Sequence, residues 1–468
     1  MASLKEPIVL PHPEDPFHCC KLGRKKYATI LTNLVTNYSD GFVLAINNKW
    51  GTGKTTFVKM WQQHIELGEQ ASTIYFNAWE NDFEDNPLTA LMGELKVWSG
   101  AGKSEEPYKS LLQHAAALSK EIAPAIVKAV AEKYIDTQVL TDVLEAATKG
   151  ASDIFVREVD EYSKKKDSIA QFRKKLADFI NTKNGSKPLV FIIDELDRCR
   201  PNYAVAILEQ IKHFFSIKNM IFVLSIDKEQ LGHAVRGVYG SDRIDADEYL
   251  RRFVDIEFSL PDPTEGKFLD FLYQYYEFDS IFSSSFRKNN ADFDHDPSAF
   301  LSSCKVFFRD FSLRKQQKLM ASLKIILTGF SHQERILPKI LVFLAYIKSE
   351  HVLYYNDIKT RRLEISDLHK KFYEVVDQFI KVDDAYFLLS IEGYLLNFYG
   401  NSLDLDIRGN KIFTLDPSEQ KYQLQVTSRI DDKRLFDFFN SLSRDPSVFH
   451  RKIDFYLKKI DLIDNFKL

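Results

Sequence analysis

The sequence predicts an α/β protein in which a buried parallel sheet precedes a helical part. Three observations predict this fold class. Short apolar runs, such as Phe42 to Ile46 and Leu189 to Ile193, have the composition of strands that are buried on both faces. A glycine-rich loop and a helix-like pattern follow the first run, and two carboxylates follow the second. A helical lid pattern begins after Pro261, and helical patterns resume from about Arg309 to Ile347.

Composition supports packed cores and narrows the class of protein. The 468 residues are 45% hydrophobic with a net charge of −3, so no global charge favours nucleic acid or an anionic membrane. The four cysteines form no CxxC pair, which argues against a zinc site and favours reduced thiols. No signal peptide is evident, and the longest apolar run, Ile340 to Ile347, is far shorter than the ~20 residues that span a bilayer. We therefore expect a cytoplasmic protein without membrane insertion.

The first apolar run leads into the loop NNKWGTGKTTF and then into a helix with apolar residues at helical spacing. Strand, glycine-rich loop and helix in this order are typical of a phosphate-binding loop, or P-loop. We expect the backbone N–H groups from Lys49 to Thr56 to turn inward around the phosphates, with the helix N-terminus adding positive potential. The predicted nucleotide-binding residues of this loop are Asn48, Lys49, Trp50, Gly51, Thr52, Gly53, Lys54, Thr55 and Thr56.

Two side chains of the loop have predicted chemical roles. Lys54 is expected to reach the β and γ phosphates of a nucleoside triphosphate, and Thr55 is expected to hold Mg²⁺ through its hydroxyl. Asn48 stands where the usual pattern has its first glycine. We expect it to replace glycine there because asparagine tolerates positive φ better than most residues.

Polar residues end the second and third strand runs. Asp194 and Glu195 close the run in PLVFIIDELDRCRP; Asp194 is predicted to hold Mg²⁺, and Glu195 to orient and deprotonate the attacking water. Ser225 and Asp227 close the run in NMIFVLSIDKE. Ligands bind at this edge of open α/β sheets, so a polar group here could sense the γ phosphate. An ordinary turn with Asp227 as a helix cap explains the pattern equally well.

With these motifs in place, the chain resembles the KAP family of P-loop NTPases. The similar segments are KWGTGKTTF, IYFNAWEND, FIIDELDRCRP, VLSIDKEQL, YLRRFVDIEFSLP, FSLRKQQKLM and GRKKYATIL, which together cover roughly residues 20 to 330. The resemblance implies an additional-strand type of parallel sheet with a catalytic acid beside the magnesium-binding aspartate. It also implies ATP as the substrate and Mg²⁺ as the cofactor.

The resemblance further implies roles for several arginines. Arg314 would be a sensor arginine that reaches the γ phosphate from a helical lid. Arg198 and Arg200 could stabilise charge in the transition state, in the same or a neighbouring subunit, and Arg251 and Arg252 are weaker candidates. Guanidinium suits this work because it stays charged and makes bidentate contacts to phosphate oxygens.

The expected organisation has three parts: a P-loop NTPase core over residues 1–264 with a helical insertion at about 100–185, a helical lid over 265–360, and a small C-terminal α+β or mostly helical module over 361–468. The Ala-rich insertion predicts an amphipathic hairpin instead of the membrane helices that many KAP proteins carry. The polar segment 283–300 predicts a surface loop, and IFTLDPSEQKYQLQV predicts a β-hairpin.

We expect a Mg-dependent ATPase that hydrolyses ATP to ADP and phosphate and thereby drives assembly or conformational switching. By family analogy, it would self-associate and act in bacterial anti-phage defence beside a separate protein effector. The alternative is a nucleotide-gated scaffold or a nucleic-acid-binding module with little turnover. Two basic clusters on a predicted helix, Lys164 to Lys166 and Arg173 to Lys175, would bind the nucleic acid in that case.

Overall fold

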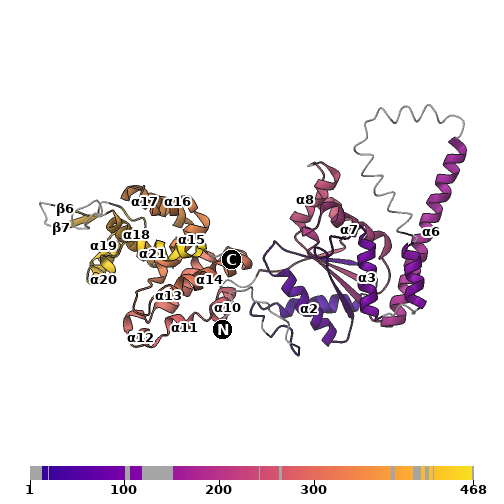
Figure 1. Cartoon of the computed structure of the whole chain (residues 1–468), viewed down its shortest axis with the longest axis horizontal. Coiled ribbons are helices and arrows are strands. Elements are labelled where there is room, and N and C mark those ends of the chain that lie inside the picture. The colour runs from indigo at the N-terminus through magenta and orange to yellow at the C-terminus, as the bar shows by residue number, and fades with distance from the viewer. Residues whose placement is uncertain are drawn as a thin grey trace. The chain divides into compact units, whose positions relative to one another are not determined.

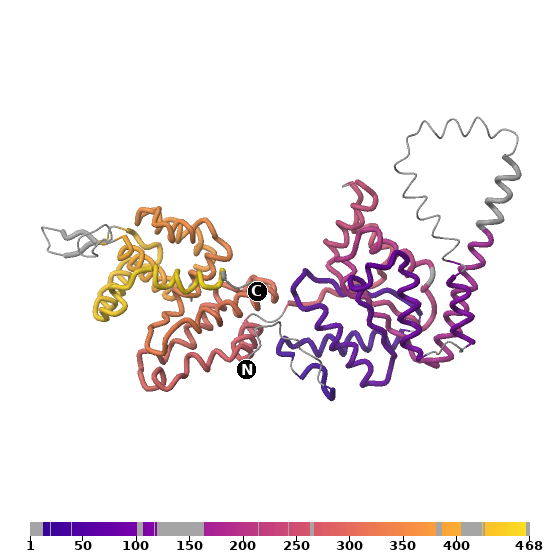
Figure 2. Tube along the Cα trace, in the orientation of Figure 1, coloured from indigo at the N-terminus to yellow at the C-terminus, as the bar shows by residue number. Residues whose placement is uncertain are grey.

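The computed structural model describes residues 13–18, 20–38, 40–100, 106–116, 118, 151–241, 243–262, 266–380, 385–403, 413–416, 421–424 and 426–465. These residues form two compact units, and the chain passes from the first unit to the second after Asp262. Figure 1 labels the elements and Figure 2 traces the chain through them.

The first unit is built on a five-stranded parallel sheet. Its elements are α1 (Lys25–Asn37), β1 (Val43–Asn47), α2 (Lys54–Leu67), β2 (Ser72–Asn77), α3 (Pro87–Ser99), α6 (Ala151–Asn184), β3 (Leu189–Asp194), η1 (Leu196–Arg198), α7 (Pro201–Phe214), β4 (Met220–Ile226), α8 (Lys228–Tyr239), α9 (Ala246–Leu250) and β5 (Ile256–Ser259). The strand order is β2-β3-β4-β1-β5, and every pairing is parallel. Strand β4 therefore lies between the loop-bearing β1 and the acidic β3, which confirms the additional-strand sheet.

Helices cover both faces of this sheet. Leu44 and Ile46 belong to a core cluster with residues of α1 and α2, whereas Val43 and Ala45 belong to a second cluster with residues of α3, α6, α7 and α8. Figures 1 and 2 show helices on both sides of the sheet. Strands β3 and β4 are buried along their whole length because they are central and covered on both sides. The sheet is thus a rigid base that fixes where each strand ends.

The second unit is mostly helical. Its elements are α10 (Lys267–Tyr275), α11 (Asp279–Phe282), α12 (Ser285–Lys288), η2 (Ala291–Phe293), α13 (Asp296–Phe308), α14 (Leu313–Thr328), α15 (Pro338–Glu350), α16 (Val352–Lys359), α17 (Ile365–Val376), η3 (Asp377–Phe379), α18 (Ala385–Ser402), β6 (Phe413–Asp416), β7 (Lys421–Leu424), α19 (Asp432–Leu442), α20 (Pro446–Phe449), α21 (Asp454–Asp461) and η4 (Leu462–Asn465). One hydrophobic core runs from Leu269 to Ile460, with α15 near its centre. Strands β6 and β7 pair in antiparallel register, as the hairpin prediction requires.

Two expectations about this unit need correction. Among the described residues, a single core joins residues on both sides of position 361, so no separate core begins there. The segment 283–300 is ordered as α12, η2 and the start of α13 and is not a plain surface loop. The polar composition of this segment did not reveal its buried residues. Phe293 and Phe300 are buried in the core, and the almost fully buried Arg287 pairs with Asp296 at 3.0 Å. Most of the predicted Ala-rich hairpin lies outside the described residues.

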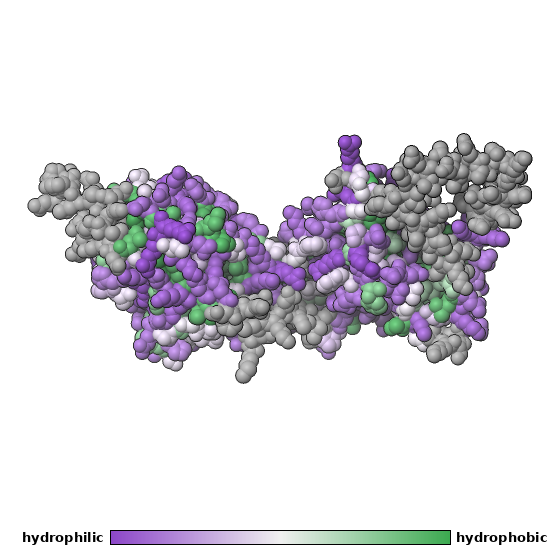
Figure 3. Space-filling model, turned by 45° about the horizontal axis from the view of Figure 1, so that its top comes forward, coloured by the Kyte–Doolittle hydropathy of each residue, from purple (hydrophilic) through white to green (hydrophobic). Residues whose placement is uncertain are grey.

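None of the described helices combines the length and hydropathy needed to cross a membrane. The face shown in Figure 3 is mainly hydrophilic, with hydrophobic residues gathered in smaller patches.

Candidate nucleotide-binding site

The predicted P-loop connects the end of β1 to the start of α2. Strand β1 ends at Asn47 and helix α2 begins at Lys54, so the loop lies at the carboxyl edge of the sheet. Gly51 and Gly53 adopt left-handed backbone conformations, with φ of 76° and 80°. Only glycine enters this region without steric cost, so these two glycines give the loop its curvature.

The loop presents a row of backbone N–H groups. Lys49 donates its N–H to the Asn48 side-chain oxygen at 2.7 Å, and Trp50 donates to Asp227 Oδ2 at 3.1 Å. The amides from Gly51 to Thr56 have no acceptor in the described part of the chain. The ring of free donors therefore begins two residues later than the sequence suggested, because neighbouring side chains satisfy its first two members.

Asn48 replaces glycine for a different reason from the one expected. It is absent from the described non-glycine residues with positive φ, so backbone tolerance is not its role. Its side-chain amide donates to the carbonyl of Leu260 at 2.6 Å and contacts Asp262 Oδ1 at 3.4 Å. Asn48 thus ties the start of the loop to the segment that follows β5.

Lys54 is a largely buried cation facing several acids. Its Nζ donates to the carbonyls of Asn48 at 2.6 Å and Lys49 at 3.1 Å. Burial lowers its pKa, and the nearby carboxylates of Asp197, Asp227 and Asp194, in that order, raise it. Lys54 thus carries its charge at the edge of the sheet where Asp194, Asp197 and Asp227 gather.

Asp194 ends the central strand β3 and is almost fully buried. Its carboxylate accepts hydrogen bonds from the Tyr75 hydroxyl and from the Glu195 amide, both at 3.0 Å. In the sheet register it is flanked by Asn77 of β2 and Ser225 of β4. The Ser225 hydroxyl is completely buried and has no hydrogen-bond partner in the described structure. It is therefore a polar group at this edge that the described residues do not use.

Glu195 adopts a left-handed conformation, with φ of 60°, in the turn after β3. Its carboxylate accepts a 2.6 Å ion pair from Arg198 and a 3.4 Å hydrogen bond from Asn77. Burial raises the pKa of Glu195, while Arg198 opposes the shift. The Arg198 guanidinium also lies 5.7 Å from the exposed ring of Trp79. Arg198 and Asn77 therefore hold the carboxylate of Glu195, the predicted base, in place.

Asp197 connects the P-loop to two strand ends. Its Oδ2 accepts hydrogen bonds from the Trp50 indole N–H and, at 3.1 Å, from the Asp227 amide. Asp227 in turn accepts the Trp50 backbone N–H and caps α8 by accepting from Gln230 N at 3.4 Å. The prediction that Asp227 caps a helix is thus confirmed, and Asp227 also contacts the P-loop directly. Burial raises the pKa of Asp197.

The other predicted arginines are placed differently. Arg200 pairs with Asp82 at 2.9 Å, and Arg251 pairs with Glu248 at 3.2 Å on the surface. Arg252 is exposed. Arg314 lies in the first turn of α14 in the second unit, so its predicted role as a sensor arginine stays a prediction.

Thr55 and Thr56 lie in the first turn of α2, where Thr55 is half-buried and Thr56 exposed. Oxygens from Thr55 and Asp194 are the kind of ligand that Mg²⁺ takes, alongside phosphate and water. The free amides and Lys54 complete a set of donors that fits a Mg·nucleotide.

Sequence reasoning missed four residues that shape the site. Asn77 had a readable signal, since it ends a strand run at the ligand-binding edge. Tyr75 and Asp197 had none beyond their place beside known motifs. Arg24, which donates to two P-loop carbonyls, also had no local signal because its partners lie 28 and 29 residues further along the chain.

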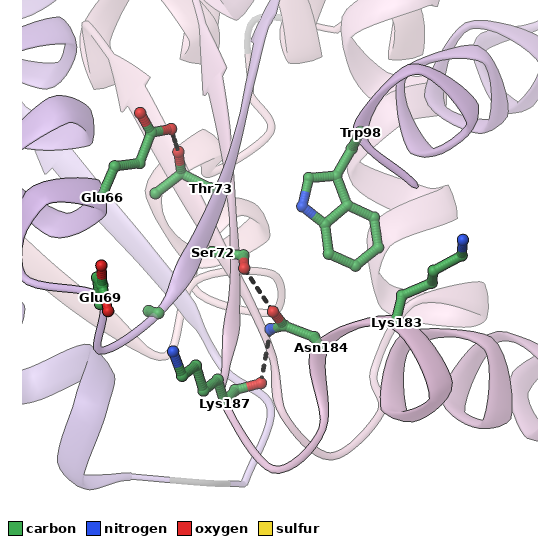
Figure 4. Close-up of a pocket in the computed structure, with 9 residues that line it drawn as sticks. Glu66, Glu69, Ser72, Thr73, Trp98, Lys183, Asn184 and Lys187 are labelled. Carbon is green, nitrogen blue, oxygen red and sulfur yellow. Dashed lines mark hydrogen bonds between the residues drawn. The ribbon is translucent and has the colours of Figure 1, made fainter. Parts of the chain in front are cut away.

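A separate cavity of about 430 Å³ lies at the opposite edge of the sheet. It borders Ser72 and Thr73 at the start of β2 and is lined by Glu66, Glu69, Trp98, Lys183, Asn184 and Lys187. Figure 4 shows Asn184 bridging the Ser72 hydroxyl and the Lys187 carbonyl. The cavity is lined by both acidic and basic side chains, and none of its lining residues belongs to the P-loop.

The strand order, the P-loop and the acidic end of β3 define a P-loop NTPase. A sequence profile described as the KAP family P-loop domain matches residues 24–330, which is most of the chain. The chain therefore belongs to the KAP family.

Two solved structures are also similar. The ORC2 protein of Aeropyrum pernix, solved as ADPNP–ADP complexes, shares 15% identity with a TM-score of 0.35, covering 89% of this chain and 92% of that one. Cdc6p of Pyrobaculum aerophilum shares 11% identity with a TM-score of 0.39, covering 98% of each chain. No curated protein matches this chain significantly.

Proposed function

We propose that the protein hydrolyses ATP to ADP and phosphate with Mg²⁺ as cofactor. One observation supports this most strongly: the free amides of Gly51 to Thr56 and the buried Lys54 lie at the same carboxyl edge of the sheet where the acidic strand β3 ends, with only β4 between β3 and β1. In this proposal, a bound phosphate group would have positive donors on one side and a carboxylate able to bind metal on the other.

The protein's own residues perform three tasks in this proposal. The loop amides bind the phosphates, and Lys54 exchanges its loop carbonyls for β- and γ-phosphate oxygens. Thr55 and Asp194 would hold Mg²⁺, which would supply positive charge to neutralise the phosphate oxygens. Glu195 orients water and accepts its proton as the water oxygen attacks the γ phosphorus and the bond to the β–γ bridging oxygen breaks.

The ion pair with Arg198 restricts how Glu195 can accept that proton. The 2.6 Å pair fixes the carboxylate and uses one of its oxygens. We propose that nucleotide binding separates the pair and frees Arg198 to stabilise the negative charge of the transition state. The raised pKa of Glu195 makes it a stronger base than an ordinary carboxylate, which suits proton transfer near neutral pH.

The test is the variant Glu195→Gln, with the exposed Glu80→Gln as the matched control. E195Q is expected to bind Mg·ATP with an affinity close to wild-type but to release phosphate at least ~100-fold more slowly, since general-base catalysis contributes about 10²–10⁴-fold. E80Q should behave as wild-type. Unchanged phosphate release from E195Q would refute the assignment of Glu195 as the base.

We further propose that hydrolysis drives self-association or lid movement, with Arg314 as the γ-phosphate sensor. By family analogy, the process would serve anti-phage defence with a separate effector. Bacteria that carry the wild-type gene and its neighbours should survive phage better than bacteria that carry E195Q. Equal survival would remove the defence proposal and leave the ATPase proposal standing.

Nucleic-acid binding is a second candidate because several lysines of the predicted clusters are exposed on α6. Lys164, Lys166, Lys174 and Lys175 face solvent, whereas Arg173 donates to the carbonyls that end α7. A salt-dependent gel shift that disappears when Lys164 to Lys166 are changed to glutamine would support this function. A shift that survives the change would exclude this surface.

A further inference from the structure

Arg24 contacts the P-loop from the side opposite its free amides. It caps helix α1 and is only 3% exposed. Its Nη2 donates to the carbonyl of Thr52 at 2.8 Å, and its Nη1 donates to the carbonyl of Gly53 at 3.2 Å. The planar fork of one guanidinium thus holds two successive peptide groups of the loop.

These two bonds help to fix where the next two amides point; the Gly53 carbonyl also accepts the Phe57 N–H of α2 at 3.1 Å. In a trans peptide the C=O and N–H groups point in opposite directions. The Thr52 carbonyl shares its peptide with the Gly53 N–H, and the Gly53 carbonyl shares its peptide with the Lys54 N–H. Because Arg24 holds both carbonyls on one side, the N–H groups of Gly53 and Lys54 face the other side, where the phosphates are proposed to bind.

Arg24 also carries a buried charge with an incomplete set of partners. No carboxylate in the described residues lies within ion-pair distance of it, and its Nε is buried without a hydrogen-bond partner. Burial lowers its pKa, opposed at longer range by Cys20 and Asp262. Arginine nevertheless remains charged in proteins, so a buried guanidinium without a counter-ion favours the binding of a nearby anion.

We propose that Arg24 is a positioning residue for nucleotide binding: it aims the Gly53 and Lys54 amides at the β phosphate and adds a positive charge that the phosphates balance. The proposal rests on the proposed ATP-binding function. It assigns Arg24 no contact with the nucleotide and no chemical step.

The test compares Arg24→Met, Arg24→Lys and the control Lys26→Met, which removes an exposed charge from the same helix. Kd for ATP and ADP with Mg²⁺ is measured by titration calorimetry, and the thermal midpoint is measured without nucleotide. R24M should weaken both nucleotides about 10- to 100-fold, because two charge-assisted bonds that orient the loop are lost. R24K keeps the charge but not the fork, so its loss should be intermediate, and K26M should bind as wild-type.

Binding of ATP by folded R24M within twofold of wild-type would overturn the proposal. So would a lower thermal midpoint with unchanged affinity, because Arg24 would then be only structural. Should R24M fail to fold, the same criteria apply to R24K. Wild-type protein that binds no nucleotide would refute the ATPase proposal as well, whereas wild-type binding with an unaffected variant refutes this one alone.

Discussion

Removing the indole N–H of the P-loop residue Trp50 should measurably weaken nucleotide binding. Trp50→Phe keeps an aromatic ring but deletes the indole donor that Asp197 accepts. A hydrogen bond to a charged group contributes about 1.5–3 kcal/mol. We take the lower end because Asp197 keeps its second donor, the Asp227 amide, and because 45% of Trp50 is exposed. The expected loss of ~1.5 kcal/mol corresponds to an ATP Kd about tenfold higher.

Calorimetric titration with a non-hydrolysable ATP analogue and Mg²⁺ measures this change directly. Trp79→Phe is the matched control, since Trp79 is similarly exposed and its ring contacts Arg198 only through the face. A double-mutant cycle with Asp197→Asn isolates the bond, because partners that touch should couple by about 0.5 kcal/mol or more. A Kd for W50F within twofold of wild-type, or strictly additive losses, would show that this bond does not position the loop.

Three further predictions concern catalysis, pH and packing. Arg198→Met should move the acid limb of the kcat/KM profile, which reports the free enzyme, to higher pH, because Arg198 lowers the pKa of Glu195 and the base must be ionised; an unmoved limb would contradict this pairing. Burial raises the pKa of Asp296 to about 6 from 3.8, so folding stability should fall by up to ~3 kcal/mol as pH rises between these values. Asp296→Asn should lack that dependence in urea unfolding at several pH values. Gly41→Ala should destabilise by at least ~2 kcal/mol, because its Cβ would lie 2.1 Å from a backbone carbonyl, whereas Gly93→Ala in α3 has free space and should stabilise by about 0.5–1 kcal/mol in the same assay.

The parallel sheet was predictable because its signals are local. Short apolar runs, each followed by a turn and a helix pattern, have the composition of buried parallel strands. The carboxyl-edge rule then placed Asp194, Glu195, Ser225 and Asp227 together without any knowledge of tertiary contacts. In the structure, Asp194 and Ser225 lie opposite each other on the neighbouring strands β3 and β4.

The parts that failed depend on partners far away in sequence. The segment 283–300 reads as polar, yet Arg287 is buried because Asp296 and the carbonyl of Glu334 receive its donors. A one-dimensional pattern counts that arginine as a surface charge. The boundary expected near residue 361 failed for a related reason, since helices on both sides contribute to one core that no local composition shift reveals.

Asn48 shows how the P-loop tolerates its departure from the usual pattern. A glycine is required only where the backbone enters the left-handed region, and in this loop those positions are Gly51 and Gly53. The start of the loop is instead fixed from outside, by the Asn48 side chain on Leu260 and by Asp227 on the Trp50 amide. The side chains of Asn48 and Asp227 therefore position the start of the loop, where other P-loops have a glycine. Asn48→Gly would keep the backbone path but lose the hydrogen bond to the Leu260 carbonyl.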